Sequence, residues 1–343
     1  MLARTGEALF WIGRYLERAE NTARLLDDTY HRLVESRVPD DPGAWGGVLD
    51  SAGLREAFER RGDDGSDPSA SQPSPSQATV TSYLVTDLSH PSSVLSSVAA
   101  VRENARGVRQ QLSTELWEEI NDFHLALQRR RVATELTRQP HEFYSFVRRR
   151  AQAMTGVAAE TWVHEDGWRF FTLGRHLERA SFVARIIRVH LQSAESGEGP
   201  QLEALLRVTS AMAAHRRTRA GMPTLRTTVR LLMLSDTLPR SLRFGATEAQ
   251  RLLLELAADP RSAPLAARML GRMQAELDYA DIDEVLSGDP MKELSNYEAI
   301  LADACSAVAA EFFQARLDLD QIHTVRLTPG PVAASLSTGS EFA

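Results

Sequence analysis

The sequence predicts an all-α protein, a helical bundle of about ten helices with an internal duplication. Long stretches carry apolar residues at the 3.6-residue period of an α-helix, and the fifteen prolines fall where such helices could start or stop. The stretch at 79–85 alternates like a strand, but no second strand is predicted to pair with it. One helical segment occurs twice, which indicates a duplicated half.

Polar residues next to prolines mark several expected helix starts. Asp289 stands directly before Pro290, and Ser262 stands two residues before Pro264. Aspartate and serine side chains accept hydrogen bonds from free backbone N–H groups at a helix start, and proline is tolerated in the first turn. Asp236 likewise stands three residues before Pro239. We therefore expect Asp289, Ser262 and Asp236 to be N-caps.

Two segments are expected to be disordered, and the rest of the chain is expected to form a single domain. The segments are an insertion at 60–79, rich in Gly, Ser, Asp and Pro, and the tail at 328–343. The domain spans 1–327, with repeat halves at about 1–135 and 140–327. We expect a pseudo-two-fold axis to relate the halves.

Composition argues against several classes of protein. The formal net charge of −7 argues against nucleic-acid binding, which needs a dominant basic face. No apolar run approaches the roughly 20 residues of a membrane span, and the N-terminus lacks the pattern of a secretory signal. We expect a cytoplasmic protein with no membrane partner.

The reactive residue types are few. Cys305 is the only cysteine, which excludes an intrachain disulfide, and its apolar neighbours predict a core position. Lys292 is the only lysine, so 38 of the 39 basic residues are arginines. Arginine pairs bidentately with carboxylates and phosphates but is a poor base, so lysine-dependent catalysis is nearly excluded.

The repeated segment is the strongest internal pattern. Phe10–Leu26 aligns without gaps on Phe171–Ile187, at an offset of 161 residues, and nine of the seventeen positions are identical. The core-facing arc of the first copy comprises Leu9, Ile12, Leu16, Ala19, Ala23 and Leu26. Gly13 and Gly174 each cost about 1 kcal/mol inside a helix, so their presence predicts close approach by another helix or a ligand.

The opposite arc of this helix is charged, and it also holds Phe10 and Leu25, so we expect it to be covered. In a structural interpretation, Arg14, Glu17 and Arg18 pair at i, i+3 and i+4 and lock two pseudo-symmetric helices together. In a functional interpretation, both copies face a shared cleft, where Glu17 and Glu178 are the catalytic candidates. The arginine clamp and its polar neighbours, the ligand-binding candidates, would then be Arg14, Arg18, Asn21, Arg24, Arg175 and Arg179.

Other motifs for chemistry are missing from the sequence. The later histidines, at 141, 164, 176, 190 and 215, do not form HExxH or a comparable pair, so no metal site is expected. The chain has no GxGxxG, GxxxxGK[ST] or GxSxG, so neither a nucleotide loop nor a nucleophile elbow is expected. We expect no cofactor.

The first residues, RTGEALFWIGRYLERAENTARLL, resemble the bacterial alpha-E family. Blocks at 101–121, 232–244 and 277–286 resemble that family's later blocks in the same order, so the resemblance covers nearly the whole chain. It implies an all-helical fold but assigns no catalytic role. The positions of interest that match the family by this resemblance are Arg14, Glu17, Arg18, Glu20, Asn21, Arg24, Arg102, Glu103, Asn104, Arg106, Arg109, Pro239, Arg240, Ser241 and Arg243.

Two of these blocks supply further ligand-binding candidates. Residues Arg102, Glu103, Asn104 and Arg106 echo the repeated helix, so they are candidate partners for Glu17 or Arg14, with an ion-pair network as the alternative. Arg240 lies at an expected helix start, where an arginine and free N–H groups could hold an anion.

The resemblance also implies association with a circularly permuted ATP-grasp ligase and a transglutaminase-like protein, encoded nearby or fused. Such systems make or modify peptides through amide bonds. The leading hypothesis is therefore an accessory or partner protein of an ATP-grasp amide-ligase system, which presents an Arg/Glu pocket or interface to a peptide or amino-acid ligand. The alternatives are an enzyme that uses Glu17 and Glu178 as acid and base, and a purely structural scaffold.

Overall fold

The computed structural model describes residues 1–61, 74–192, 199–218, 221–259 and 261–313. Within these ranges the chain forms sixteen α-helices and no strand, which confirms the all-α prediction. The helices are α1 (Ala3–Ser36), α2 (Pro42–Ala52), α3 (Arg55–Arg60), α4 (Gln77–Thr81), α5 (Val94–Gly107), α6 (Thr114–Arg129), α7 (Val132–Arg138), α8 (Pro140–Thr161), α9 (Asp166–Gln192), α10 (Gly199–Val208), α11 (Met212–Arg217), α12 (Leu225–Leu234), α13 (Leu242–Leu256), α14 (Leu265–Tyr279), α15 (Ile282–Ser287) and α16 (Pro290–Phe312). A π-helical turn, η1 (Ser82–Thr86), and a 3-10 turn, η2 (Arg109–Gln111), complete the described elements.

The expected number of helices, about ten, is close to the number of long ones. Eleven helices have ten or more residues, and the short α3, α4, α7, α11 and α15 have five to seven. The alternating stretch at 79–85 lies in α4 and η1, so it is helical.

The expected insertion at 60–79 is wrong at its C-terminal end. Ser76 caps α4 by accepting a hydrogen bond from the Thr79 backbone N–H at 3.2 Å, and the Thr79 hydroxyl in turn accepts one from the Ser76 N–H. This capping box satisfies two backbone donors and begins a helix inside the polar stretch. Residues 62–73 and the expected tail at 328–343 lie outside the described residues.

Of the three N-caps expected near prolines, one is confirmed. Asp289 accepts a hydrogen bond from the Lys292 N–H at 3.0 Å, with Pro290 in the first turn of α16. The prediction for Ser262 is wrong, because Pro264 itself is the residue before α14 and the N–H of Leu265 donates to the Glu311 side chain at 3.1 Å. The prediction for Asp236 is also wrong, because Ser241 is the N-cap of α13.

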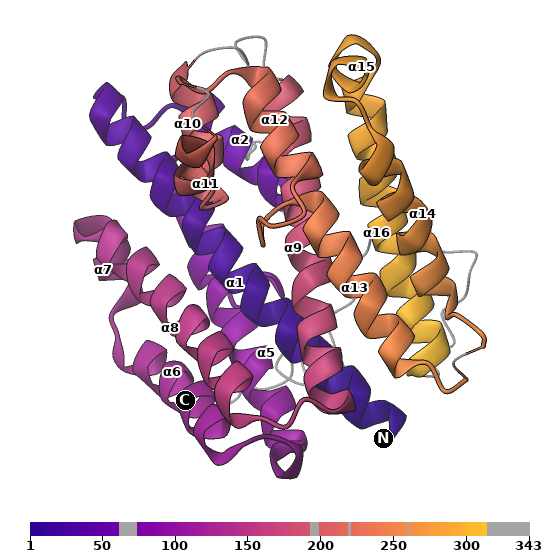
Figure 1. The fold of residues 1–343 in the computed structure, drawn as a ribbon. Coiled ribbons are helices and arrows are strands. Elements are labelled where there is room, and N and C mark those ends of the chain that lie inside the picture. Colours follow the sequence, from indigo (N-terminus) through magenta and orange to yellow (C-terminus); the bar gives the residue numbers. More distant parts are fainter. Residues whose placement is uncertain (62–73, 193–198, 219–220, 260, 314–343) are drawn as a thin grey trace.

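Eight of the long helices form two four-helix groups that meet through α1 and α9 (Figure 1). In the first group α5 and α8 pack on α1, and α6 packs on both α5 and α8. In the second, α13 and α16 pack on α9, and α14 packs on both α13 and α16. Since the short helices α7 and α15 directly precede α8 and α16, the duplication extends well beyond the repeated segment.

We propose that the boundary between the halves lies at 162–165, not near 135–140. Helix α8 contacts α1 and α6, so it belongs to the first group, and the second group begins with α9. Both α8 and α16 begin with a proline in their first turn, which supports matching the two helices.

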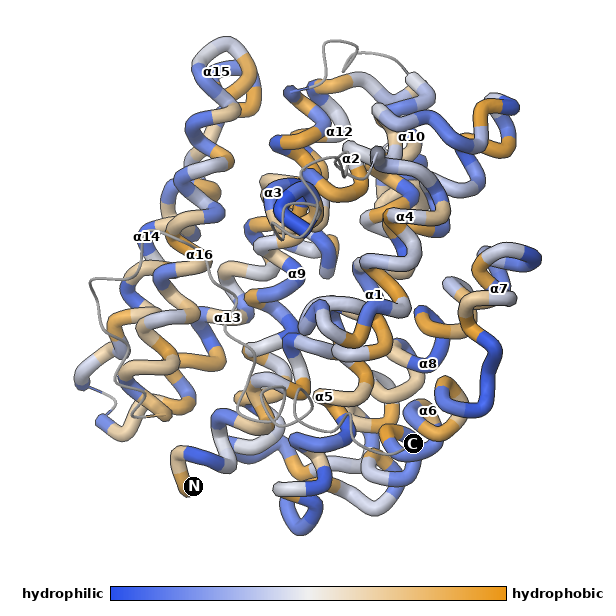
Figure 2. The backbone as a smooth tube through the Cα atoms, turned by 180° about the vertical axis from the view of Figure 1, so that it is seen from behind, coloured by the Kyte–Doolittle hydropathy of each residue, from blue (hydrophilic) through white to orange (hydrophobic). Residues whose placement is uncertain are grey.

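Apolar side chains fill the interfaces between these helices. The six residues of the predicted core-facing arc of α1 are each at most 1% exposed, so that prediction is confirmed. Cys305 is partly buried and packs against the same core. Figure 2 shows hydrophilic stretches along α1 and α9 inside the fold. No helix in the described part of the chain is both long enough and apolar enough to cross a membrane.

Candidate functional site

Helices α1 and α9 approach each other most closely at the two repeated glycines. A Cβ atom on Gly13 would lie 2.0 Å from the Phe171 carbonyl oxygen, and one on Gly174 would lie 2.2 Å from the Phe10 carbonyl oxygen. Both distances are far below any real Cβ contact, so only glycine permits this crossing. The predicted close approach is confirmed, and the neighbour is the other copy of the same helix.

The charged arc of α1 is covered, as expected. Glu17 has no exposed surface, and Arg14, Arg18, Asn21 and Arg24 are all buried. In α9, Arg179 is likewise buried. Charges removed from water in this way destabilise the fold unless partners of opposite charge compensate them. The stability of this interface therefore depends on its ion pairs.

The ion pairs run across the interface in a reciprocal pattern. Glu178 of α9 accepts two hydrogen bonds from Arg18, at 2.7 and 3.0 Å, and one from Arg14 at 2.8 Å. Glu17 of α1 accepts two from Arg179, at 2.7 and 2.6 Å, and one from Arg175 at 3.4 Å. Each Glu-Arg dipeptide of the repeat thus pairs with the dipeptide of the other copy.

The predicted pairs within one helix are therefore wrong, although the predicted locking of the two helices is right. The glycine crossing brings the opposite carboxylate within reach of a planar guanidinium. A bidentate pair shielded from water is stronger than an i, i+4 pair on a solvated surface.

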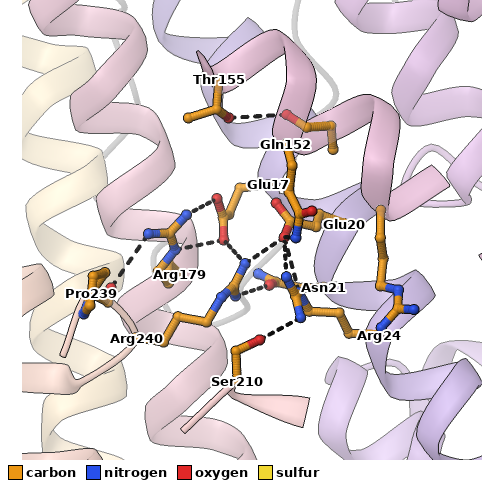
Figure 3. A network of polar contacts seen from close by, with 12 residues as sticks. Glu17, Glu20, Asn21, Arg24, Gln152, Thr155, Arg179, Ser210, Pro239 and Arg240 are labelled. Carbon is orange, nitrogen blue, oxygen red and sulfur yellow. Dashed lines mark hydrogen bonds and ion pairs between the residues drawn. The ribbon is translucent and has the colours of Figure 1, made fainter. Parts of the chain in front are cut away.

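The symmetry breaks one turn further along α1, where Arg240 enters from the segment before α13 (Figure 3). Arg240 donates to Glu20 at 2.8 Å and to the Asn21 side-chain oxygen at 2.7 Å, and it lies 3.2 Å from Glu17. Glu20 also accepts two hydrogen bonds from Arg24. The second copy has Ser181 and Phe182 at the positions of Glu20 and Asn21, so this part of the network exists once.

We call these nine charged residues the Arg/Glu cluster. Its members are Arg14, Arg18, Arg24, Arg175, Arg179, Arg240, Glu17, Glu20 and Glu178. Six guanidinium groups face three carboxylates, so three positive charges lack a counter-charge within the cluster. The thiol of Cys305 lies beside Arg14, but burial raises its pKa, so it stays neutral.

The pKa values follow from this arrangement. Burial alone would raise the pKa of Glu178, but Arg18 and Arg14 outweigh it and lower the pKa to about 2. In the same way Arg179 and Arg240 hold the pKa of Glu17 well below its usual range. Both glutamates are therefore ionised at neutral pH.

The arginines fall into two groups. At Arg179 the attraction of Glu17 outweighs burial and raises the pKa, and the pKa of Arg14 is raised as well. Burial, together with the neighbouring Arg179, lowers the pKa of Arg175. Burial lowers the pKa of Arg240 to about 10, because the attraction of Glu17 does not offset it. At Arg175 and Arg240 the carboxylates of the cluster therefore do not offset the cost of burying a positive charge.

Two buried donors of this region have no acceptor among the described residues. They are the Asn21 side-chain nitrogen and the Arg175 Nε. Nearby, Ser210 accepts from Arg24 at 2.6 Å while its backbone has a φ of 56°, a left-handed conformation that is uncommon outside glycine. Unpaired buried donors cost free energy, and strained residues gather at functional sites.

The block at 102–106 takes no part in the cluster. Arg102 donates to Asn121 of α6 at 3.2 Å and to Glu103, which also pairs with Arg106 at 2.8 Å. The Asn104 side chain donates to the Ala100 carbonyl within α5. The prediction that these residues are partners of Glu17 or Arg14 is wrong, because Arg102 reaches toward α6 and pairs there.

The residues that complete the cluster carried no recognisable sequence signal. Ser92 accepts from Arg18 at 3.2 Å, Gln152 donates to Glu20 at 3.4 Å, and Ser210 holds Arg24. Each is a common residue outside any motif. A pocket of about 400 Å³ lies beside α3 and η1, but its lining residues, Ala57, Arg60, Arg61, Tyr83, Asp87, Ser89 and His90, include none of the cluster.

Comparison with known proteins agrees with the resemblance. The chain is 26% identical over 330 residues to uncharacterized proteins of Mycobacterium bovis and Mycobacterium tuberculosis, an alignment that covers 88% of this chain and 36% of each relative. It thus spans about a third of the length of these relatives. No solved structure is significantly similar to it.

The family model for Alpha-E, described as a predicted alpha-helical domain with a conserved ER motif, matches residues 1–313. Glu17-Arg18 and Glu178-Arg179 are Glu-Arg dipeptides of this kind, and they form the reciprocal pairs between α1 and α9. The chain therefore belongs to the Alpha-E family.

Proposed function

We propose that this chain is a partner protein of an ATP-grasp amide-ligase system, and that its Arg/Glu cluster receives an anionic group. The group is a carboxylate or phosphate of the peptide, amino acid or phosphorylated intermediate that the system handles. The resemblance supplies the ligase and a transglutaminase-like protein as the partners. ATP-dependent ligation would place the protein in the cytoplasm.

The observation that carries the proposal is the uncompensated charge of the cluster. Six arginines face three glutamates in a buried site, and buried charge is normally paired. An anion would supply the missing negative charge, and arginine is the side chain that binds carboxylates and phosphates bidentately.

The unpaired donors support the same conclusion. The Asn21 nitrogen and Arg175 Nε each need an acceptor oxygen, which an anionic group would provide. The six arginine side chains remain 8–12% exposed. An anion could therefore reach guanidinium edges without opening the helix crossing.

The partner role is supported by the length of the relatives. In the mycobacterial proteins the matching segment occupies 36% of the chain, so this module occurs there joined to a longer polypeptide. A helical module that accompanies other domains within one chain is well suited to serve them as a binding partner.

The enzyme alternative has less support from the geometry. A general acid must hold a proton near neutral pH, and a good base has a pKa near the working pH. The pKa of Glu178 is about 2 and that of Glu17 is well below its usual range, so neither suits either role. No observation favours this alternative.

The direct test is co-purification of the tagged ATP-grasp protein from the same genome with this chain. The matched variants are Arg240→Gln and Arg106→Gln. In the first, Glu17 is still paired with Arg179 and Glu20 with Arg24, so the fold should survive. In the second, an ion pair of a mostly exposed arginine is lost outside the cluster. We expect wild type and Arg106→Gln to form the complex and to change the rate of ATP turnover.

Arg240→Gln should form the complex but lose most of the effect on turnover. Addition of glutamate or phosphate, at constant ionic strength against chloride, should raise the melting temperature of wild type and not of Arg240→Gln. A wild-type chain that forms no complex and leaves ATP turnover unchanged would refute the partner role. Equal melting shifts in both proteins would refute the anion site.

A further inference from the structure

A second polar group lies away from the Arg/Glu cluster, where the later part of α1 meets the start of α8. Asp27 and His31 lie four residues apart on α1, so they share one face of the helix, and His141 stands in the first turn of α8. Asp27 is buried, while about half of each imidazole side chain is exposed. Helix packing alone brings them together, because 110 residues separate His31 from His141.

Three potential ligand atoms converge in this group. His141 Nδ1 lies 2.7 Å from Asp27 Oδ1 and 2.8 Å from His31 Nε2, and the third side of the triangle measures 3.6 Å. Zinc binds imidazole nitrogen and carboxylate oxygen at about 2.0–2.2 Å, so two ligand atoms at a tetrahedral angle lie about 3.3 Å apart. Small rotations of the two exposed rings would bring all three atoms to that spacing.

Hydrogen bonding explains this arrangement less well than a bound metal ion does. His141 Nδ1 makes short contacts with both the carboxylate and the other ring nitrogen, yet it carries at most one hydrogen. A divalent cation at the centre of the triangle would accept electron pairs from all three atoms at once.

Asp27 is held in the orientation that a ligand needs. Arg148 of α8 pairs with Asp27 Oδ2 at 3.0 Å, which leaves Oδ1 directed at the histidines. Ligating carboxylates are commonly fixed by such outer hydrogen bonds. The His31 ring is further positioned by edge-on contact with Tyr30, at a centroid distance of 5.6 Å.

We propose that Asp27, His31 and His141 form a binding site for a divalent transition-metal ion such as Zn²⁺ or Co²⁺. Two imidazoles and one carboxylate are a ligand set for late first-row ions, not for Mg²⁺ or Ca²⁺, which prefer oxygen ligands. Arg148 offsets part of the charge of Asp27, which further disfavours ions held by charge alone. Three protein ligands on an exposed surface leave a coordination position open for water or for a further ligand.

The test uses the full chain without a polyhistidine tag, freed of metal with a chelator and titrated with Co²⁺. Bound Co²⁺ with nitrogen and oxygen ligands absorbs visible light, and the spectrum should lack the thiolate band that Cys305 would add. The variants are His31→Ala and His141→Ala, which should fold because both rings are half exposed. The matched control is His164→Ala, another exposed histidine.

We expect wild type and His164→Ala to bind one Co²⁺ per chain, displaced by Zn²⁺. Each triad variant should bind at least about tenfold more weakly. Zn²⁺ should also raise the melting temperature of wild type but not of the triad variants. The proposal is overturned if wild type binds no Co²⁺, or if His31→Ala and His141→Ala bind it as tightly as wild type. It does not rest on the proposed function, since neither the Arg/Glu cluster nor the ligase enters the measurement.

Discussion

Replacement of Gly13 by alanine should push α1 and α9 apart and destabilise the whole fold. The new Cβ would lie 2.0 Å from the Phe171 carbonyl oxygen, and at least 3.0 Å is needed, so the helices must separate by about 1 Å. A gap of that size forfeits about a quarter to a half of the dispersion energy at the contact. It also stretches the bonds from Arg179 to Glu17, now 2.6–2.7 Å.

Against these losses, alanine gains about 1 kcal/mol of helix propensity, and we expect a net loss of about 3 kcal/mol in the free energy of unfolding. The assay is urea denaturation followed by circular dichroism. The matched control is Gly156→Ala, an exposed position in α8 where a Cβ meets nothing within 4 Å. That substitution should stabilise the protein by about 0.5–1 kcal/mol.

The double variant Gly13→Ala/Gly174→Ala gives the sharper measurement. Both glycines set the same distance between α1 and α9, so a separation forced by the first methyl group partly accommodates the second. The double variant should therefore lose clearly less than the sum of the two single losses. Two results would show that the glycines do not set the helix spacing. One is a free energy of unfolding for Gly13→Ala within 1 kcal/mol of wild type, and the other is strict additivity of the two single losses.

Three further predictions concern the charged groups. Glu17→Gln leaves three arginines around an uncharged amide and should cost about 3–5 kcal/mol of unfolding free energy in urea; a loss below 1 kcal/mol would contradict the ion-pair account. Burial, with the nearby Arg179, lowers the pKa of His176 to about 3. Between pH 6.5 and 4.5 the His176 side chain is therefore protonated in the unfolded chain but stays neutral in the folded chain. As the pH falls through that window, this group should lower the free energy of unfolding by up to about 1.4 kcal/mol per pH unit. His176→Leu should make the slope shallower but not flat, because burial also lowers the pKa of His90, to about 4; an unchanged slope would count against a neutral buried ring. Arg106→Ala removes a mostly exposed ion pair and should change stability by less than about 0.5 kcal/mol; a larger change would mean that the 102–106 block matters to the fold.

Below pH 4.5 the buried glutamates add their own loss of stability to that of the histidine. The folded pKa of Glu178, about 2, lies below its ordinary value of 4.5, so its contribution is fully present above pH 4.5 and is lost as the pH falls toward 2. The histidine effect begins at higher pH, which allows the two to be separated in one titration of stability.

The helical class, the duplication and the covered charged arc follow from the amino-acid sequence alone. These rest on local properties: the period of apolar residues, the proline positions and the identity of the two repeat copies. The role of Gly13 and Gly174 was also foreseeable, because glycine inside a long helix is costly unless a neighbour needs the space.

Which charges pair depends on how the helices pack against each other. Glu17 and Glu178 each have an arginine three residues earlier in their own helix, and that spacing favoured pairs within each helix. The crossing of α1 and α9 instead pairs each glutamate with arginines of the other copy. The entry of Arg240 could not be foreseen as a contact of Glu20, since 220 residues separate them. The triad of Asp27, His31 and His141 depended in the same way on the packing of α8 against α1. Local periodicity specifies a helix and its buried face, whereas pairing between distant side chains depends on crossing points that arise only when the helices pack.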